Sequence, residues 1–225
     1  MPVFLLSEES VAFPPVYLSE AGGLLAVGGD LSVPRLVEAY RHGIFPWYDS
    51  GSPVLWWSPH PRCVLLPENL HISKSLNKIL TCAQFDFTVD KAFADVIRLC
   101  ALVKRPRQDG TWIVPEMLQA YTDMHRAGYA HSIEVWENGK LVGGLYGIIL
   151  GRIFFGESMF HLRPNASKAA LVWWVHKLRS LDFMIIDCQQ ATEHMLRFGA
   201  QLMDRKEFIR ILDAAVAQQT ILSPY

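Results

Sequence analysis

The chain has almost no net charge and no long hydrophobic run. Its 21 basic and 22 acidic residues give a formal charge of −1 over 225 residues, so any nucleic-acid surface must be a local basic patch. The longest apolar stretch, residues 141–155, is interrupted by glycines and by Arg152, and it falls short of the ~18–20 residues that cross a membrane. The first residues lack the positive segment and long apolar core of a signal peptide.

Cysteine is scarce, and the chain contains neither internal repeats nor low-complexity tracts. Cys63, Cys82, Cys100 and Cys188 stand far apart without a Cys-x-x-Cys pair, which argues against a zinc site and against a disulfide framework. The composition, 51% hydrophobic and 19% charged, is that of a folded protein. We expect a cytoplasmic protein with reduced thiols.

The first 62 residues are rich in proline, glycine and aromatic residues. Ser32 and Pro34 predict the start of a helix that ends at Gly43. We expect residues 1–62 to form a small α+β N-terminal domain and residues 63–225 to form a second domain. The aromatic residues of the first part are too many for its own core, so some should face the second.

From residue 63 the pattern becomes regular. Asn138-Gly139 lies between two β-patterned runs and predicts a hairpin, with a third strand from Arg152. A helix over 167–181 follows, because apolar residues recur there every three or four positions. Strands at 62–66, 85–89 and 183–187 and helices at 73–80, 91–102, 115–128, 192–198 and 205–217 complete the prediction. This order is typical of an acetyltransferase-like (GNAT) α/β domain.

Two of the predicted strands end in polar groups. Glu157 and Ser158 follow Ile-Phe-Phe-Gly, and Asp187 and Gln189 follow Met-Ile-Ile. Carboxylates at the end of an apolar strand carry a desolvation cost, and one helix between the strands would bring both ends to the same rim of a sheet, where ligands bind. Two structural alternatives stay open: a salt bridge from Glu157 to Arg163 or Lys168, and Asp187 capping or tying down the next turn.

The helix after Glu157 opens with Asn165-Ala-Ser167-Lys168. Free backbone N–H groups there can hold an anion, with Lys168 adding charge, although simple capping by Ser167 explains the segment equally well. An acetyl-CoA enzyme usually has glycines at this junction, and this chain has none. Cys188 with His194 or His131 suggests a thiol nucleophile, but a cysteine on an apolar strand is more often inert core.

One loop concentrates basic residues. Lys104, Arg105 and Arg107 are either a solvated loop or a phosphate contact whose binding is salt-dependent. Trp47 and Trp112 lie in predicted loops, where aromatic rings wall a pocket or stack on a base.

These segments, read in order, resemble the leucyl/phenylalanyl-tRNA–protein transferase family from about residue 10 to residue 210. Any one motif is weak, but nine in register are specific. They are Gly28-Gly-Asp-Leu31, Tyr40-Arg-His-Gly-Ile-Phe-Pro-Trp47, Leu55-Trp-Trp-Ser-Pro59, Gly110-Thr-Trp-Ile113, His131-Ser-Ile-Glu-Val-Trp136, Val142-Gly-Gly-Leu-Tyr-Gly147, Gly156-Glu-Ser-Met-Phe160, Asn165-Ala-Ser-Lys168 and Ile186-Asp-Cys-Gln189.

The resemblance implies a small N-terminal domain joined to an acetyltransferase-like domain. It implies transfer of Leu or Phe, and less readily Met, from aminoacyl-tRNA to proteins that begin with Arg or Lys, which marks them for N-end-rule degradation. No metal or CoA is expected, the protein should not need a membrane, and we expect a monomer.

The resemblance also assigns site residues. Asp187 and Gln189 would orient and deprotonate the acceptor amine, and Glu157 would hold the basic acceptor residue, with Ser158 beside it. Trp47 and Trp112 would contact the terminal adenosine, and Lys104, Arg105 and Arg107 would bind tRNA. The amino-acid pocket would include Leu145, Trp174, Leu178, Ser180 and Ile186.

The chain departs from the family pattern in that pocket, because the family often has Met in place of Leu145 and Phe in place of Trp174. The Leu:Phe preference is therefore open. Two other functions also remain possible from sequence: a CoA-dependent N-acyltransferase on the same fold, and a non-catalytic tRNA-binding module.

Overall fold

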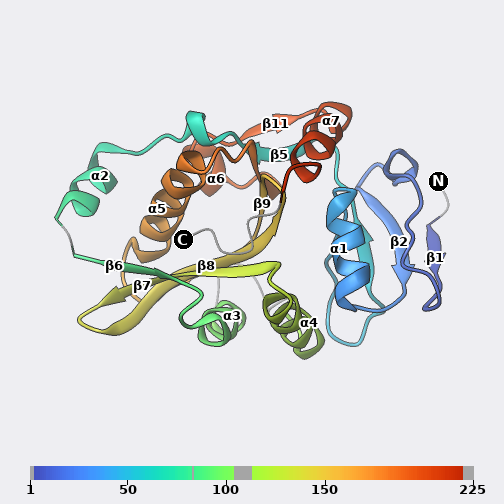
Figure 1. The fold of residues 1–225 in the computed structure, drawn as a ribbon, viewed down its shortest axis with the longest axis horizontal. Coiled ribbons are helices and arrows are strands. Elements are labelled where there is room, and N and C mark those ends of the chain that lie inside the picture. Colours follow the sequence, from blue (N-terminus) through green and yellow to red (C-terminus); the bar gives the residue numbers. More distant parts are fainter. Residues whose placement is uncertain (1–2, 83, 104–112, 220–225) are drawn as a thin grey trace.

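The computed structural model describes residues 3–82, 84–103 and 113–219, which form a small and a large sheet with helices around them (Figure 1). The small sheet has four strands in the order β1-β2-β4-β3. Helix α1 lies between it and the rest of the molecule (Figure 1). These elements are β1 (Phe4–Leu6), β2 (Leu24–Gly28), α1 (Val33–Arg41), β3 (Phe45–Pro46) and β4 (Leu55–Trp57), with a short 3-10 helix at Val16–Leu18.

The large sheet has seven strands in the order β11-β5-β10-β9-β8-β7-β6. Its centre is an antiparallel meander of β7, β8 and β9, and β10 then pairs parallel to β9. The strands are β5 (Arg62–Leu65), β6 (Asp86–Val89), β7 (Ala130–Glu137), β8 (Lys140–Leu150), β9 (Ile153–His161), β10 (Ile185–Gln189) and β11 (Gln201–Met203).

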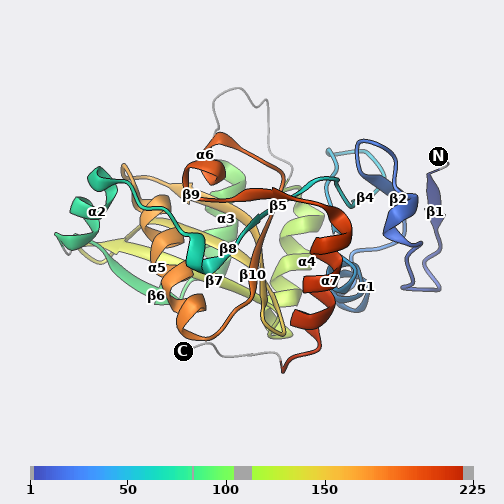
Figure 2. The ribbon, with the colours of Figure 1, turned by 90° about the horizontal axis from the view of Figure 1, so that it is seen from above.

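Helices cover both faces of the large sheet. Helices α5 and α6 lie on one face, and α3 and α4 lie on the other (Figure 1); α7 lies at the side nearest the small sheet, as the view from above also shows (Figure 2). Their bounds are α2 (Lys74–Thr81), α3 (Phe93–Leu102), α4 (Pro115–Arg126), α5 (Ala166–Ser180), α6 (Glu193–Arg197) and α7 (Arg205–Val216), with a second 3-10 helix at Pro67–Asn69.

The structure confirms the α/β class and the predicted sequence of a meander, a long helix and a parallel strand, which is the order expected of an acetyltransferase-like sheet. The Asn138-Gly139 hairpin is present between β7 and β8. One boundary was wrong: β9 does not end near Glu157 but continues to His161. β11, a three-residue edge strand, was not predicted.

A continuous hydrophobic core joins the two sheets. Tyr40 and Trp56 from the first part are fully buried together with Phe155 and Phe208 from the second. Gly43, after α1, has φ +69, and a Cβ there would lie 2.8 Å from the Phe208 ring, so glycine allows the close contact between this turn and α7. Because the core is shared, an independent domain at residues 1–62 stays a prediction.

Among the helices that the structure describes, none is both long enough and apolar enough to traverse a bilayer.

Candidate active site

The candidate site lies where β9 and β10 diverge. The two strands pair in parallel from Ile185 opposite Ile153 to Asp187 opposite Phe155. Beyond this point β9 continues to His161, paired only with β8 on its other side, while β10 ends at Gln189. Glu157 and Gln189, both half-buried, therefore lie at the opening between β9 and β10 where the two strands part.

A β-bulge places Glu157 at this opening. Ser158 pairs with Tyr146 and Gly156 with Gly147, so Glu157 is the extra residue between them. A Cβ on Gly147 would lie 2.2 Å from the Phe155 carbonyl oxygen, a contact that only glycine permits. The bulge turns the Glu157 side chain toward α1 and α4.

A second irregularity places Gln189. The pairing of β10 with β5 shifts register between Asp187 and Gln189, and Gln189 has φ +60. Its backbone N–H donates to Asp187 Oδ1 at 2.9 Å. A non-glycine residue in the left-handed region costs on the order of 1 kcal/mol or more and is most common at functional sites. The simple alternation of strand side chains is therefore broken between Asp187 and Gln189.

Glu157 collects hydrogen bonds from three separate elements. Tyr40 Oη of α1 lies 2.7 Å from Glu157 Oε1, and Tyr121 Oη of α4 lies 2.9 Å from Oε2. Gln189 Nε2 of β10 donates to Oε1 at 2.9 Å. Neither Arg163 nor Lys168 is its partner, because Arg163 pairs with Glu137 and Lys168 contacts Asn165.

The surroundings change the acidity of these groups. Burial raises the pKa of Glu157 to about 7, while the hydrogen bonds from Tyr40, Tyr121 and Gln189 oppose that rise. Burial, and next the nearby Glu157 charge, raises the pKa of both tyrosines well above the usual range. The phenols therefore remain protonated donors, whereas Glu157 exchanges its proton near neutral pH.

Asp187 occupies a closed position behind Glu157. It is fully buried, and its two oxygens accept from Arg62 Nε at 2.8 Å and Arg62 Nη2 at 2.6 Å. The Arg62 guanidinium lies between the rings of Phe45 and Phe208, with its carbon 4.9 and 4.8 Å from their centroids. Its oxygens accept from Arg62 and from the Gln189 N–H, so a direct contact of Asp187 with the acceptor amine stays a prediction.

Most of the predicted amino-acid pocket comes together on the α5 side of the sheet. Leu145, Trp174, Leu178 and Ile186 are buried in one hydrophobic cluster. Ile186 directly precedes Asp187, so the cluster begins next to the polar group. Ser180 is different: it lies exposed at the end of α5 and donates to the Lys177 carbonyl, and the structure does not bring it to this cluster.

The cysteine and serine side chains near the opening, and the histidine proposed as a partner of the cysteine, make contacts within the fold. The Cys188 thiol is 3.8 Å from the Ile186 carbonyl oxygen, and contact with Cys63, then burial, raises its pKa well above the usual range. A thiol that keeps its proton is a poor nucleophile. His131 pairs with Asp90 instead. Ser158 is half-buried on β9, opposite Tyr146.

The aromatic and basic candidates are placed only in part. Trp47 is 40% exposed on the small sheet, with its ring 5.8 Å from that of Trp57. Trp112, Lys104, Arg105 and Arg107 lie outside the described residues. Within residues 3–82, 84–103 and 113–219, His, Cys, Asp and Glu form no group of three or more that could hold a metal ion.

Sequence reasoning did not assign a role to Tyr40, Tyr121 or Arg62. Arg62 gave a signal, since a charged residue opens the apolar strand β5. Tyr40 stands within one of the quoted motifs. Tyr121 looked like any apolar-face residue of α4.

Comparison with known proteins shows the family. The profile of the family described as leucyl/phenylalanyl-tRNA protein transferase matches residues 64–213, and the profile of that family's N-terminal domain matches residues 29–60. The chain belongs to this family. Members of it are aminoacyltransferases, and the predicted resemblance is confirmed.

Two relatives show how far the likeness extends. The leucyl/phenylalanyl-tRNA–protein transferase of Solidesulfovibrio magneticus is 54% identical over 225 residues, covering 100% of this chain and 91% of that protein. The one from Syntrophobacter fumaroxidans is 57% identical over 212 residues, covering 94% of this chain and 90% of its own. Among solved structures, a GCN5-related N-acetyltransferase from Kribbella flavida overlaps at a TM-score of 0.37 and 12% identity, over 78% of this chain and 62% of that one.

Proposed function

We propose that this member of the family transfers Leu or Phe from its tRNA ester to the N-terminal amine of an acceptor protein. The observation that carries the proposal is the half-buried Glu157, held by Tyr40, Tyr121 and Gln189 at the opening between β9 and β10. The apolar cluster of Trp174 lies on the other side of the same strands. A polar group for an amine and an apolar site for a side chain thus lie on the two sides of the same strands, and Ile186 of the cluster directly precedes Asp187.

We assign Glu157 as the group that accepts the proton of the acceptor amine. Aminolysis needs a neutral amine, and a free α-amino group has a pKa near ~8. A carboxylate whose pKa is about 7 accepts that proton readily at neutral pH. Gln189 holds Glu157 in place, and Asp187 acts as a positioning residue through Arg62 and the Gln189 N–H.

The reaction then balances without a further reactant. The acceptor ammonium gives one proton to the Glu157 carboxylate, and its nitrogen attacks the ester carbonyl carbon. The new C–N bond forms as the C–O bond to the ribose breaks. The second proton of the attacking nitrogen passes to the departing ribose oxygen, and Glu157 returns its proton to water.

The apolar cluster would receive the esterified side chain. Leu145 and Trp174 are rigid walls, whereas Met159, opposite Leu145 across β8 and β9, is half-buried and flexible. An apolar pocket discriminates by only ~1–3 kcal/mol per methylene, so Leu, Phe and also Met can share it. Ser158 and Ile186 would border the ester, and Trp47 and Trp112 would contact the terminal adenosine.

The acceptor specificity, location, oligomeric state, tRNA contacts and domain division are taken from the family resemblance and belong to the same proposal. The acceptor would begin with Arg or Lys, the product would enter N-end-rule degradation, and the protein would act as a cytoplasmic monomer. Lys104, Arg105 and Arg107 would contact tRNA. The division at residue 62 would separate a small N-terminal domain from the catalytic one.

The test is a competition experiment. Labelled leucyl-tRNA and phenylalanyl-tRNA are supplied together with a peptide that begins with Arg, and a peptide that differs only in starting with Glu is the control. We expect both amino acids on the first peptide and neither on the second. If neither amino acid is transferred to the peptide that begins with Arg, the proposal is refuted. A separate measurement tests the alternative: a rise in melting temperature with acetyl-CoA but not with aminoacyl-tRNA would favour a CoA-dependent N-acyltransferase.

A further inference from the structure

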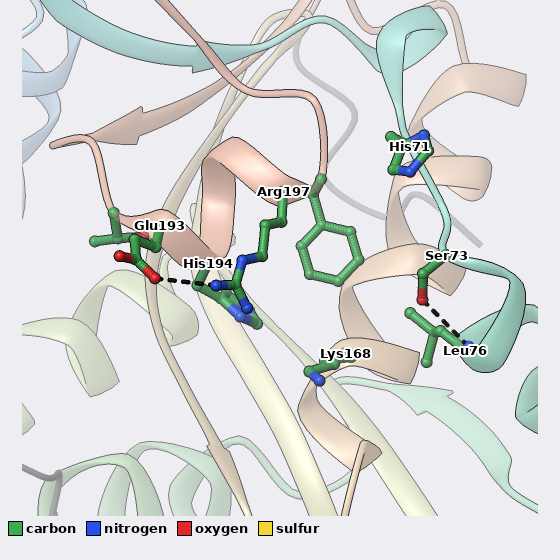
Figure 3. A pocket seen from close by; sticks show the side chains of 9 residues that line it. His71, Ser73, Leu76, Lys168, Glu193, His194 and Arg197 are labelled. Carbon is green, nitrogen blue, oxygen red and sulfur yellow. Dashed lines mark hydrogen bonds and ion pairs between the residues drawn. The ribbon is translucent and has the colours of Figure 1, made fainter.

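A cavity lies close to the candidate active site. Its volume is about 1040 Å³, and it lies between the start of α5, helix α6 and the segment that leads into α2 (Figure 3). The side chains around it come from residues 71–76, 168 and 192–198. Nothing in the proposed transfer reaction uses these residues.

The rim of this cavity carries positive charge. Lys168, His194 and Arg197 all line it (Figure 3). Burial, and next the charge of Lys168, lowers the pKa of His194, so its ring is neutral at neutral pH and the permanent charges are Lys168 and Arg197. Glu193 offsets part of this charge through a 3.1 Å ion pair with Arg197, but both side chains are at least 80% exposed, so the pair is weak and exchangeable.

The floor is apolar and aromatic. Leu76 and Phe198 are each only 5% exposed. The His194 ring stands edge-on to Phe198 with centroids 5.1 Å apart, and its Nε2 is buried without a hydrogen-bond partner. An aromatic floor beneath exchangeable cations matches the chemistry of a nucleotide, which combines a flat base with a phosphate.

The cavity adjoins the proposed reaction site. Thr192, on its wall, follows Gln189 by three residues, a span of at most ~10 Å. Leu76 and Phe198 also belong to the hydrophobic cluster that contains Trp174 and Ile186. A chain of nucleotides whose last ribose carries the amino acid would therefore have its preceding residues within reach of this cavity.

We propose that the cavity binds a nucleotide of the single-stranded 3′ end of the aminoacyl-tRNA. Lys168 and Arg197 bind its phosphate, with Arg197 exchanging Glu193 for the phosphate, and the base lies beside the half-buried His194 ring, which rests on Phe198. This inference rests on the proposed function. It adds a binding site for the RNA strand, independent of base sequence, next to the site where the ester reacts.

The test compares two substrates. Aminoacyl-tRNA contains internucleotide phosphates, whereas an aminoacyl ester of plain adenosine contains none. For Lys168→Ala, Arg197→Ala and the double variant, we expect KM for aminoacyl-tRNA to rise several-fold per substitution with kcat unchanged. The slope of log KM against log salt should fall by about one per cation removed. Transfer from the adenosine ester should keep its wild-type KM and kcat.

The matched control is Arg179→Ala, at the opposite, exposed end of α5, which should leave both substrates unaffected. The inference is overturned if the double variant keeps the wild-type KM for aminoacyl-tRNA, or if KM for the adenosine ester rises equally. Should the wild-type protein transfer from neither substrate, the proposed function fails on its own. Fluorescence anisotropy with uncharged tRNA then decides: weaker binding by the double variant supports the cavity, and equal binding overturns it.

Discussion

Glu157 and Glu134 are both carboxylates held by hydroxyl groups inside the large sheet, yet their surroundings differ in kind. Glu134 is fully buried and receives bonds from its own neighbourhood: Ser132 Oγ at 2.5 Å, Thr88 Oγ1 at 2.6 Å and the backbone N–H groups that lead into α3. Glu157 is half-buried and is held by side chains from α1, α4 and β10.

Glu134 is a sealed carboxylate, with no surface exposed to solvent, whereas Glu157 is an open carboxylate that keeps part of its surface exposed. Burial raises the pKa of both, so acidity alone does not tell them apart. Glu134 joins β6, β7 and the start of α3 and has no room for a ligand. Glu157 stands where β9 and β10 part and is only half-buried, so part of its surface remains exposed. Asp187, with no exposed surface and a bidentate partner, belongs with Glu134.

The largest effect on stability should come from breaking the sealed ion pair. Asp187→Leu leaves the Arg62 guanidinium buried without its carboxylate, so we expect a loss of about 3–5 kcal/mol in the free energy of unfolding. Transfer should also be lost, because the Gln189 N–H loses its acceptor. Equilibrium denaturation in urea measures the first effect and single-turnover transfer the second.

The paired variant Arg62→Met with Asp187→Leu is the control. Replacing both charges by apolar groups should restore most of the stability but not the transfer. Recovery of transfer in the double variant would show that Asp187 does not position Gln189.

Exchanging the two glutamates for glutamine tests the distinction directly. Glu157→Gln removes the proton acceptor, so transfer should slow by about 100-fold or more while the free energy of unfolding changes by no more than about 1 kcal/mol. Glu134→Gln should do the reverse: its amide cannot accept from all its donors, costing about 1–3 kcal/mol of stability with transfer nearly unchanged. If Glu134→Gln lowers transfer as much as Glu157→Gln does, the distinction between sealed and open carboxylates is wrong.

The titration of Glu157 should make the transfer rate rise with pH and the stability of the fold fall with pH. Its folded pKa of about 7 exceeds its ordinary value of 4.5, so its contribution to stability is present below about pH 4.5 and is lost as pH rises through about 7. The transfer rate should rise over the same upper range, since only the carboxylate accepts a proton. Melting temperatures and kcat/KM of the wild type and Glu157→Gln across pH measure this difference. The variant should keep only the dependence due to the substrate amine, near ~8; a wild-type profile without an additional rise near pH 7 would count against Glu157 as the base.

Local patterns were enough to predict much of this arrangement. Turn chemistry at Asn138-Gly139 and helical periodicity in α5 depend on neighbours in sequence, and both elements formed as expected. The rim that unites Glu157 with Gln189 was predicted because a single helix connects their strands. Ile186 and Trp174 were assigned to one pocket by family resemblance, and the structure brings them into one cluster.

What the sequence did not reveal depends on long-range contacts. Arg62 lies 125 positions from Asp187, and Tyr40 lies 117 positions from Glu157; no periodicity connects such pairs. The two bulges also escaped prediction, because a one-residue insertion in a strand has no composition signal beyond a glycine such as Gly147. These features decide which carboxylate is open, so the roles of Asp187 and Glu157 could not be separated beforehand.

The smallest expected effect concerns the phenols that hold Glu157. Tyr121→Phe and Tyr40→Phe each remove a hydrogen bond that lowers the pKa of Glu157, so the rise of transfer rate with pH should move to higher pH. Near pH 7 the rate should fall less than about 10-fold, since one donor and Gln189 remain. Tyr129→Phe, in the turn before β7, is the matched control and should leave the pH profile in place. A profile that moves to lower pH, or stays unchanged in Tyr40→Phe combined with Tyr121→Phe, would mean that the phenols do not set the acidity of Glu157. The open carboxylate would then differ from the sealed one by exposure alone.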